Sequence, residues 1–230
     1  QALIASMRSI ARITGASSFE HMRRNPEFQA MFNRAMAEGT RNAAPGIAEA
    51  GGFDRFRSVV DVGGGDGTLL AAVLRAHAHL RGTVFDLAEG METAPQVLAA
   101  AGVSDRGDAE AGDFFAAVPG GHDAYLVKSV IHDWDDERAG TILRNIRAAM
   151  DRDGVLLVVE PVMPDAPSSS PDVLMMVMSD LNMLVCTGGK ERTESELRAL
   201  LADAGFAVRA ITPVSGPTNY SVIEAVAASG

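Results

Sequence analysis

A glycine-rich segment with two acids, Asp61-Val-Gly63-Gly-Gly65-Asp-Gly67, directly follows an apolar run. Glycine lets a backbone turn sharply and come close to a ligand, and three glycines spaced two apart exceed what a tight turn requires. The dinucleotide fingerprint G-x-G-x-x-G would place its last glycine at position 68, which is Thr68. The spacing G-x-G-x-G, with Asp61 two residues before Gly63, instead suits a sulfonium amino acid, because the carboxylate can face the ammonium group of the ligand.

Two further acids stand where the next two expected strands end. Asp86 closes the run 82–86, and Asp113 lies in Ala111-Gly-Asp-Phe-Phe115. A carboxylate at Asp86 can accept hydrogen bonds from both ribose hydroxyls of a nucleoside cofactor, and Asp113 is placed to reach an adenine amino group. Each acid alone could be a solvated loop carboxylate. Three acids at successive strand ends, where open α/β sheets bind ligands, predict a cofactor site.

Alternating strands and helices must position these acids, and the pattern begins at residue 58. We expect strands at 58–62, 82–86, near 113, and at 124–128, 155–160, 206–212 and 220–226, with helices at 68–79, 89–101, 135–150, 171–185 and 193–205. Short connections between alternating elements predict an α/β fold with a doubly wound, Rossmann-like, seven-stranded sheet. The last two strands lack a helix between them, so they should form a C-terminal antiparallel hairpin.

The first forty residues have helical patterns. Asn25 as N-cap and Pro26 at the first helical position predict the start of a helix. Apolar residues then recur at helical spacing on one face: Phe28, Met31, Phe32, Ala35 and Met36. Core packing is the default interpretation of such a face. We therefore expect residues 1–45 to form an N-terminal helical segment that packs on a domain spanning 46–230.

Four ordered motifs resemble those of the small-molecule O-methyltransferases of the caffeate and hydroxyindole type, a group that includes bacterial enzymes acting on aromatic antibiotics. They are the glycine segment, Gly112-Asp-Phe-Phe115, Lys128-Ser-Val-Ile-His132-Asp133-Trp134 and Gly188-Gly-Lys-Glu191-Arg-Thr193. The resemblance implies the catalytic domain of such an enzyme and an S-adenosylmethionine site. With the acids above, the cofactor-binding residues would be Asp61, Gly63, Gly65, Asp86, Leu87, Asp113, Phe114 and Lys128.

The same resemblance implies a general base, His132, flanked by Glu160 and Glu191. It also implies a substrate site, made of Phe32, Met36, Asp133, Trp134 and Met183. The chemistry agrees, because a phenol has a pKa near 10 and needs a base at neutral pH, whereas histidine is close to the operating range. A neighbouring carboxylate can orient the imidazole and stabilise the imidazolium. A single histidine such as His132 would by default be a helix-capping or packed residue. Its place at the end of the fourth strand, on the edge of the sheet that binds ligands, favours the role of general base instead.

Composition limits the partners. Lys and Arg number 20 and Asp and Glu 30, giving a net charge of −10, which disfavours nucleic acid. No apolar run approaches the roughly 20 residues of a membrane helix, and Cys186 is the only cysteine, so we expect a cytoplasmic protein without disulfides. The five histidines show no metal-ligand spacing. The chain begins at Gln1, so we expect a fragment without the N-terminal dimerisation domain that the resemblance implies, and a homodimer at full length. Phe28, Met31 and Phe32 should then partly face surface that a partner segment normally covers.

Two other functions fit parts of the pattern. A nicotinamide-dependent oxidoreductase could use a similar sheet, but the glycine spacing and the terminal hairpin count against it. A protein of this family could also bind S-adenosylmethionine without transferring its methyl group, although His132 together with Glu160 and Glu191 argues against lost chemistry. Transfer of a methyl group to a hydroxyl of a small phenolic acceptor is therefore the predicted function.

Overall fold

The computed structural model describes residues 15, 21, 24–166 and 170–228. The helices expected before residue 24 fall largely outside these described residues. The helices are α4 (Pro26–Ala50), α5 (Thr68–Ala76), α6 (Ala94–Ala100), α7 (Asp136–Ala149), α8 (Pro171–Cys186) and α9 (Glu194–Asp203), with short 3₁₀ turns η1 (Phe53–Arg55) and η2 (Ile131–Asp133). The strands are β1 (Ser58–Val62), β2 (Arg81–Asp86), β3 (Gly107–Ala111), β4 (Ala124–Lys128), β5 (Val155–Met163), β6 (Arg192–Thr193), β7 (Phe206–Pro213) and β8 (Tyr220–Ala227).

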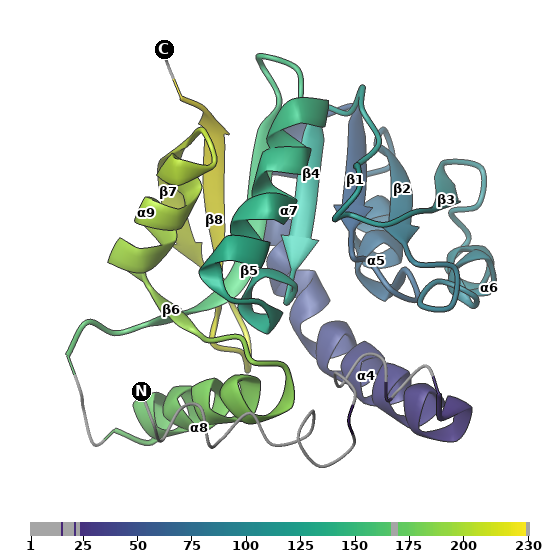
Figure 1. The fold of residues 1–230 in the computed structure, drawn as a ribbon. Helices are drawn as coiled ribbons and strands as arrows, with labels where there is room; N and C mark the ends of the chain where they lie inside the picture. Colours follow the sequence, from purple (N-terminus) through teal and green to yellow (C-terminus); the bar gives the residue numbers. More distant parts are fainter. Residues whose placement is uncertain (1–14, 16–20, 22–23, 167–169, 229–230) are drawn as a thin grey trace.

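The sheet runs in the order β3-β2-β1-β4-β5-β8-β7 (Figure 1). The first five strands in that order are parallel, and β8 pairs antiparallel with both β5 and β7. This confirms the predicted seven-strand path and its C-terminal hairpin. An additional two-residue strand, β6, pairs with the end of β5. The strand β6 was not predicted, because two residues are too few to show an alternating pattern.

Helices cover both faces of the sheet, as expected for a doubly wound fold. The end of α4 packs with α5 and α6 in one apolar core, and α7 and α9 pack in the other. Residues 155–160 of β5 are buried without interruption, which is typical of a central strand covered on both faces. The parallel strands point toward α4 and α8, which lie beyond the carboxyl ends of β1 and β4 (Figure 1). The residues predicted at the strand ends therefore lie at the edge of the sheet nearest these two helices.

The helix α4 changes character along its length. Ala43, Ala44 and Ile47 are buried, and this half packs on the domain. By contrast, Phe28 is 44% and Met31 53% exposed, so the default of core packing does not hold for the first two turns, and these side chains partly face the surface, as expected for a chain without the partner segment. Helical periodicity identified the apolar face correctly but not what covers it. The proposed division at residue 45 lies inside α4 and stays a prediction.

None of the helices in the described part of the chain has both the length and the apolar character needed to cross a membrane.

Candidate active site

A cavity of about 670 Å³ lies at the carboxyl ends of β1, β2 and β4. The predicted cofactor residues all line it, as do four of the five predicted substrate residues: Asp61, Gly63, Gly65, Asp86, Leu87, Asp113, Phe114, Lys128, Phe32, Met36, Asp133 and Trp134. The predicted base and its partners do not line it, and neither does Met183: the four are His132, Glu160, Glu191 and Met183. The structure thus places the predicted residues in two adjoining groups, a cavity wall and a buried cluster.

The glycine segment wraps the end of β1 in a left-handed conformation that favours glycine. The φ angles of Gly63 and Gly65 are 73° and 55°. A side chain at Gly63 would also collide with Val130, since its Cβ would lie 2.6 Å from Val130 Cγ2. Asp86 holds this loop from the next strand, because its Oδ2 accepts a hydrogen bond from the Gly65 N–H at 2.8 Å. The loop and the second strand end are therefore fixed relative to each other.

Asp61 is a buried carboxylate whose charge is not fully matched. Its side chain lines the cavity, yet its Oδ2 makes no hydrogen bond with any described residue. Burial raises the pKa of Asp61 to about 7, against the opposing effect of Lys128. A buried oxygen of this kind costs free energy unless a donor reaches it. An ammonium group of a ligand in the cavity would supply such a donor, as the sequence pattern predicted.

Aromatic side chains form another part of the cavity wall. Phe114, Phe115 and Trp134 contact one another edge to face, with ring centroids 4.9–6.4 Å apart. The Arg138 guanidinium lies over both Phe115 and Trp134, 4.4 and 4.2 Å from their centroids. Asp113 accepts a hydrogen bond from the Phe115 N–H at 2.8 Å, which fixes the turn that carries these rings. Sequence reasoning missed Phe115 and Arg138, although the Phe-Phe pair was in the quoted motif.

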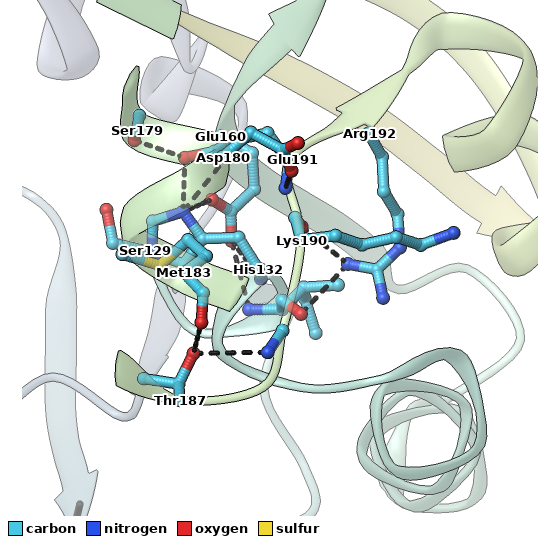
Figure 2. Close-up of polar contacts among 12 residues, drawn as sticks. Ser129, His132, Glu160, Ser179, Asp180, Met183, Thr187, Lys190, Glu191 and Arg192 are labelled. Carbon is cyan, nitrogen blue, oxygen red and sulfur yellow. Dashed lines mark hydrogen bonds and ion pairs between the residues drawn. The ribbon is translucent and has the colours of Figure 1, made fainter. Parts of the chain in front are cut away.

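His132 lies on the turn η2, directly after β4, with its Nδ1 against two carboxylates (Figure 2). Nδ1 is 3.1 Å and 3.3 Å from the two oxygens of Glu191, within hydrogen-bonding geometry. Glu160 Oε2 is 3.2 Å from the same nitrogen but makes no hydrogen bond with the described residues, so it acts through its charge. A nitrogen that faces carboxylates must carry the proton. Among the described residues, Nε2 makes no hydrogen bond, so it is the nitrogen available to a ligand.

The cluster around His132 holds more negative charge than one imidazolium neutralises. Burial lowers the pKa of His132, but the carboxylates of Glu160, Glu191 and Asp133 outweigh it and raise the pKa to about 10. Burial has the opposite effect on Glu160: it raises the pKa of this carboxyl group, although the positive charge of His132 opposes the rise. For Asp133, burial raises the pKa to about 7, again against the effect of His132. These groups share their protons, so the cluster titrates as a unit.

The backbone that carries His132 is held from two sides. Glu160 Oε1 accepts hydrogen bonds from the N–H groups of Val130, Ile131 and His132, at 3.1, 2.9 and 3.4 Å. On the other side, the Lys190 N–H donates to the His132 carbonyl at 2.9 Å. The neighbouring Gly189 has no room for a side chain, because a Cβ there would overlap the same carbonyl. This clamp fixes the turn before any ligand binds.

Arg192 completes the clamp, and sequence reasoning missed its role. Its buried guanidinium donates to the carbonyls of Ile131, at 3.0 Å, and Trp134, at 2.8 Å, as Figure 2 shows in part. It also forms an ion pair with Asp136 at 2.9 Å. The residue stood within the quoted Glu191-Arg-Thr193 motif, but nothing in the sequence indicated which carbonyls it would reach.

Two residues of the helix α8 orient Glu191 through hydrogen bonds. The Ser179 hydroxyl donates to Glu191 Oε1 at 2.7 Å, and the Glu191 N–H donates to Asp180 Oδ1 at 2.9 Å (Figure 2). Met183 is half-buried here, and its carbonyl accepts from the Thr187 hydroxyl at 2.9 Å. Met183 was predicted to line the substrate site. The residues that follow it in α8 and the next loop line the cavity instead: Leu184, Val185, Cys186, Thr187 and Gly188.

Ligand atoms of His132, Glu160 and Glu191 lie within 4.8 Å of one another, an arrangement that could also hold a cation. The sequence predicted no metal because its five histidines show no metal-ligand spacing. That expectation stays a prediction.

Comparison with known proteins identifies the family. A family described as the O-methyltransferase domain matches residues 4–207. The O-demethylpuromycin-O-methyltransferase of Streptomyces alboniger is 46% identical over 216 residues, which cover 93% of this chain and 57% of that protein. This chain therefore spans less than two thirds of the length of that relative.

Solved structures agree with this comparison. The mitomycin 7-O-methyltransferase MmcR superposes with a TM-score of 0.91 at 36% identity, over 99% of this chain and 66% of that one. The O-methyltransferase NcsB1 of neocarzinostatin biosynthesis, in complex with S-adenosylmethionine and 2-hydroxy-5-methyl naphthoic acid, superposes with a TM-score of 0.84 at 35% identity, over 98% of this chain and 68% of that one. The chain belongs to the O-methyltransferase domain family.

Proposed function

We propose that this chain transfers a methyl group from S-adenosylmethionine to a hydroxyl group of a small aromatic acceptor. The observation that carries the proposal is one juxtaposition. A cavity lined by the unmatched carboxylate Asp61 adjoins the turn on which His132 is held with Nδ1 against Glu191. Membership of the O-methyltransferase domain family supports the same reaction.

The cavity wall offers a partner for each part of the cofactor. Asp61 Oδ2 would accept from the ammonium group, and the Asp86 carboxylate at the end of β2 would accept from the ribose hydroxyls. The Phe114 ring would pack on the adenine, and Asp113 would reach its amino group. The solved complex of NcsB1 with S-adenosylmethionine, on the same fold, supports this assignment.

The cofactor, when bound, supplies a methyl group on a positively charged sulfur. Transfer forms an oxygen–carbon bond on the acceptor and breaks a sulfur–carbon bond, with the electron pair of the broken bond staying on sulfur. The acceptor's hydroxyl proton must leave, and we assign it to His132 Nε2. Glu191 keeps the other nitrogen protonated, which sets the tautomer that a base requires.

The pKa of about 10 bears directly on this role, because it makes His132 an imidazolium at neutral pH. A neutral imidazole with a protonated Glu160 has the same net charge as the imidazolium with ionised Glu160. Burial raises the pKa of Glu160, and its Oε2 is free to hold that proton. In this form Nε2 can accept the acceptor's proton, and the carboxylate of Glu191 stabilises the positive charge that develops.

The acceptor would enter between α4 and the end of α8, where Phe32, Met36 and Thr187 line the cavity. Phe32 and Met36 provide an apolar surface that an aromatic ring can pack on. Relatives that methylate aromatic natural products, such as the phenazine O-methyltransferase PhzM of Lysobacter antibioticus, support an acceptor of this class.

The exposed apolar face of α4, with Phe28 and Met31, favours a protein that is homodimeric at full length, in which a partner segment covers this face.

The decisive experiment is a screen of phenols and naphthols with methyl-labelled S-adenosylmethionine, followed by His132→Ala on the best acceptor. We expect methyl transfer to fall roughly 10²–10⁴-fold, with binding of S-adenosylhomocysteine nearly unchanged. Activity of the variant should recover as pH rises and the acceptor ionises in solution. A variant that matches the wild type at pH 7 would show that proximity and orientation alone drive transfer. NADH, tested beside S-adenosylhomocysteine in thermal-shift measurements, should not stabilise the protein.

A further inference from the structure

Ser129 joins the two halves of the site and has an unusual backbone. It is the one non-glycine residue with a positive φ, 53°, among the described residues. A left-handed conformation is unfavourable for serine, and such residues persist where surrounding contacts hold them. Ser129 lines the cavity between Lys128, the last residue of β4, and the turn that carries His132. We call the part of the cavity lined by Asp61, Asp86 and Lys128 the cofactor wall. The bend at Ser129 therefore sets the direction in which the chain runs from the cofactor wall to His132.

Ser129 is held by contacts from β5, Lys128 and Tyr220. Its N–H donates to the Val159 carbonyl at 3.1 Å. The Lys128 ammonium donates to the Ser129 hydroxyl at 3.1 Å, and that hydroxyl lies 2.8 Å from the Tyr220 hydroxyl. Ser129 accepts from Lys128, and in its bridge to Tyr220 either hydroxyl can donate. The Lys128 ammonium also lies over the Tyr220 ring, 4.8 Å from the centroid.

Tyr220 is well placed to act as an anchor. It is the first residue of β8, paired in register with Pro161 of β5, and is half-buried against the core. It does not line the cavity, so any effect on a ligand must pass through Ser129 and Lys128.

We propose that Tyr220 is a positioning residue that fixes both the Lys128 ammonium and the Ser129 bend, and so aligns the cofactor wall with His132. The inference rests on the cofactor site proposed above. Among the described residues, Lys128 is the cation whose charge lowers the pKa of both Asp61 and Glu160. Its position therefore affects both the Asp61 carboxylate and the cluster around His132. Tyr220 holds Lys128 directly through its ring, and its hydroxyl acts on Lys128 through the Ser129 hydroxyl.

The two contacts can be separated by substitution. Tyr220→Phe keeps the ring under Lys128 and removes the hydroxyl bridge, whereas Tyr220→Leu removes both. Calorimetric titration of the full chain with S-adenosylhomocysteine should show the dissociation constant rising about threefold to tenfold for Tyr220→Phe, and about tenfold to a hundredfold for Tyr220→Leu. Ser129→Gly, which permits the positive φ but lacks the hydroxyl, should resemble Tyr220→Phe. Ser129→Ala, which keeps the strain and loses the hydroxyl, should bind more weakly than Ser129→Gly.

The chain offers a matched control in its other tyrosine. The Tyr125 hydroxyl donates to the Ala149 carbonyl at 3.0 Å, away from the cavity, so Tyr125→Phe also removes one tyrosine hydrogen bond. This control should lower the thermal unfolding midpoint without changing the dissociation constant. Wild-type protein that fails to bind S-adenosylhomocysteine would overturn the proposed function itself. Wild-type binding with unchanged constants in the folded Tyr220→Phe and Ser129→Gly proteins would overturn the role of Tyr220 alone.

Discussion

Cofactor binding should depend on pH through Asp61. This carboxyl group is buried, its Oδ2 has no hydrogen-bond donor among the described residues, and its pKa is raised to about 7 by burial. Below that pH it is mostly neutral in the free protein. An ammonium group bound against it would stabilise the ionised form and lower its pKa. Binding of S-adenosylhomocysteine should therefore release a proton from Asp61 when the pH is near or below 7.

The magnitude follows from linkage. With a pKa of about 7, the ionised fraction of Asp61 falls about tenfold for each pH unit below about 6, and the association constant should fall with it. Calorimetry between pH 5 and pH 7, repeated in buffers of different ionisation enthalpy, measures both the constant and the proton released. Asp61→Asn should weaken binding at pH 7 by roughly 1.5–3 kcal/mol, the value of a charged hydrogen bond, and should remove the pH dependence.

The cavity provides a control for this experiment. Asp133 also lines it, and burial raises the pKa of Asp133 to about 7 as well, but it sits beside His132 rather than on the glycine loop. Asp133→Asn should keep the pH dependence of cofactor binding. If Asp133→Asn abolishes that dependence and Asp61→Asn retains it, the ammonium site has been assigned to the wrong acid. A constant that does not change between pH 5 and pH 7 in the wild type would refute the reasoning as a whole.

Three other outcomes are expected. Asp86→Ala should weaken S-adenosylhomocysteine binding by about 1.5–3 kcal/mol, and calorimetry showing wild-type affinity would remove Asp86 from the ribose site. Gly189→Ala should lower the free energy of unfolding by about 1–3 kcal/mol, because its Cβ would overlap the His132 carbonyl; denaturant unfolding at wild-type midpoint would contradict this. Replacing Phe28 and Met31 by serine in the full-length protein should shift a dimer toward monomer in sedimentation, whereas an unchanged dimer would place the interface elsewhere.

The cavity lining at the ends of β1 and β2 could be predicted from the sequence because its signals are local. Asp61 and the glycines stand within a few residues of a strand end, and Asp86 closes the next strand. Parallel strands bring such ends to one edge of the sheet, so strand boundaries alone brought these residues together. The cavity lining agrees with that geometry.

For the cluster around His132, the resemblance predicted which residues belong to it, namely His132, Glu160 and Glu191. It did not predict the contacts between them. His132 and Glu191 are 59 residues apart in sequence, and Ser129 and Tyr220 are 91 apart. No periodicity relates positions at such separations. The carboxylates that raise the pKa of His132 are brought to it by the packing of α8 and the loop after it, which the sequence pattern does not encode in any local way.

Acceptor specificity should reside in α4 and the end of α8 rather than in the strand ends. At the strand ends, Asp61 is buried, and Asp86 is hydrogen-bonded to the glycine loop. Phe32 and Met36 line the same cavity, yet they are 36% and 50% exposed, so substitutions there disturb little packing. Substitutions in α4 can therefore change which acceptor the pocket binds, while the strand ends continue to bind the same cofactor. Exchanging Phe32 and Met36 should therefore alter which phenols are methylated and leave S-adenosylhomocysteine affinity unchanged.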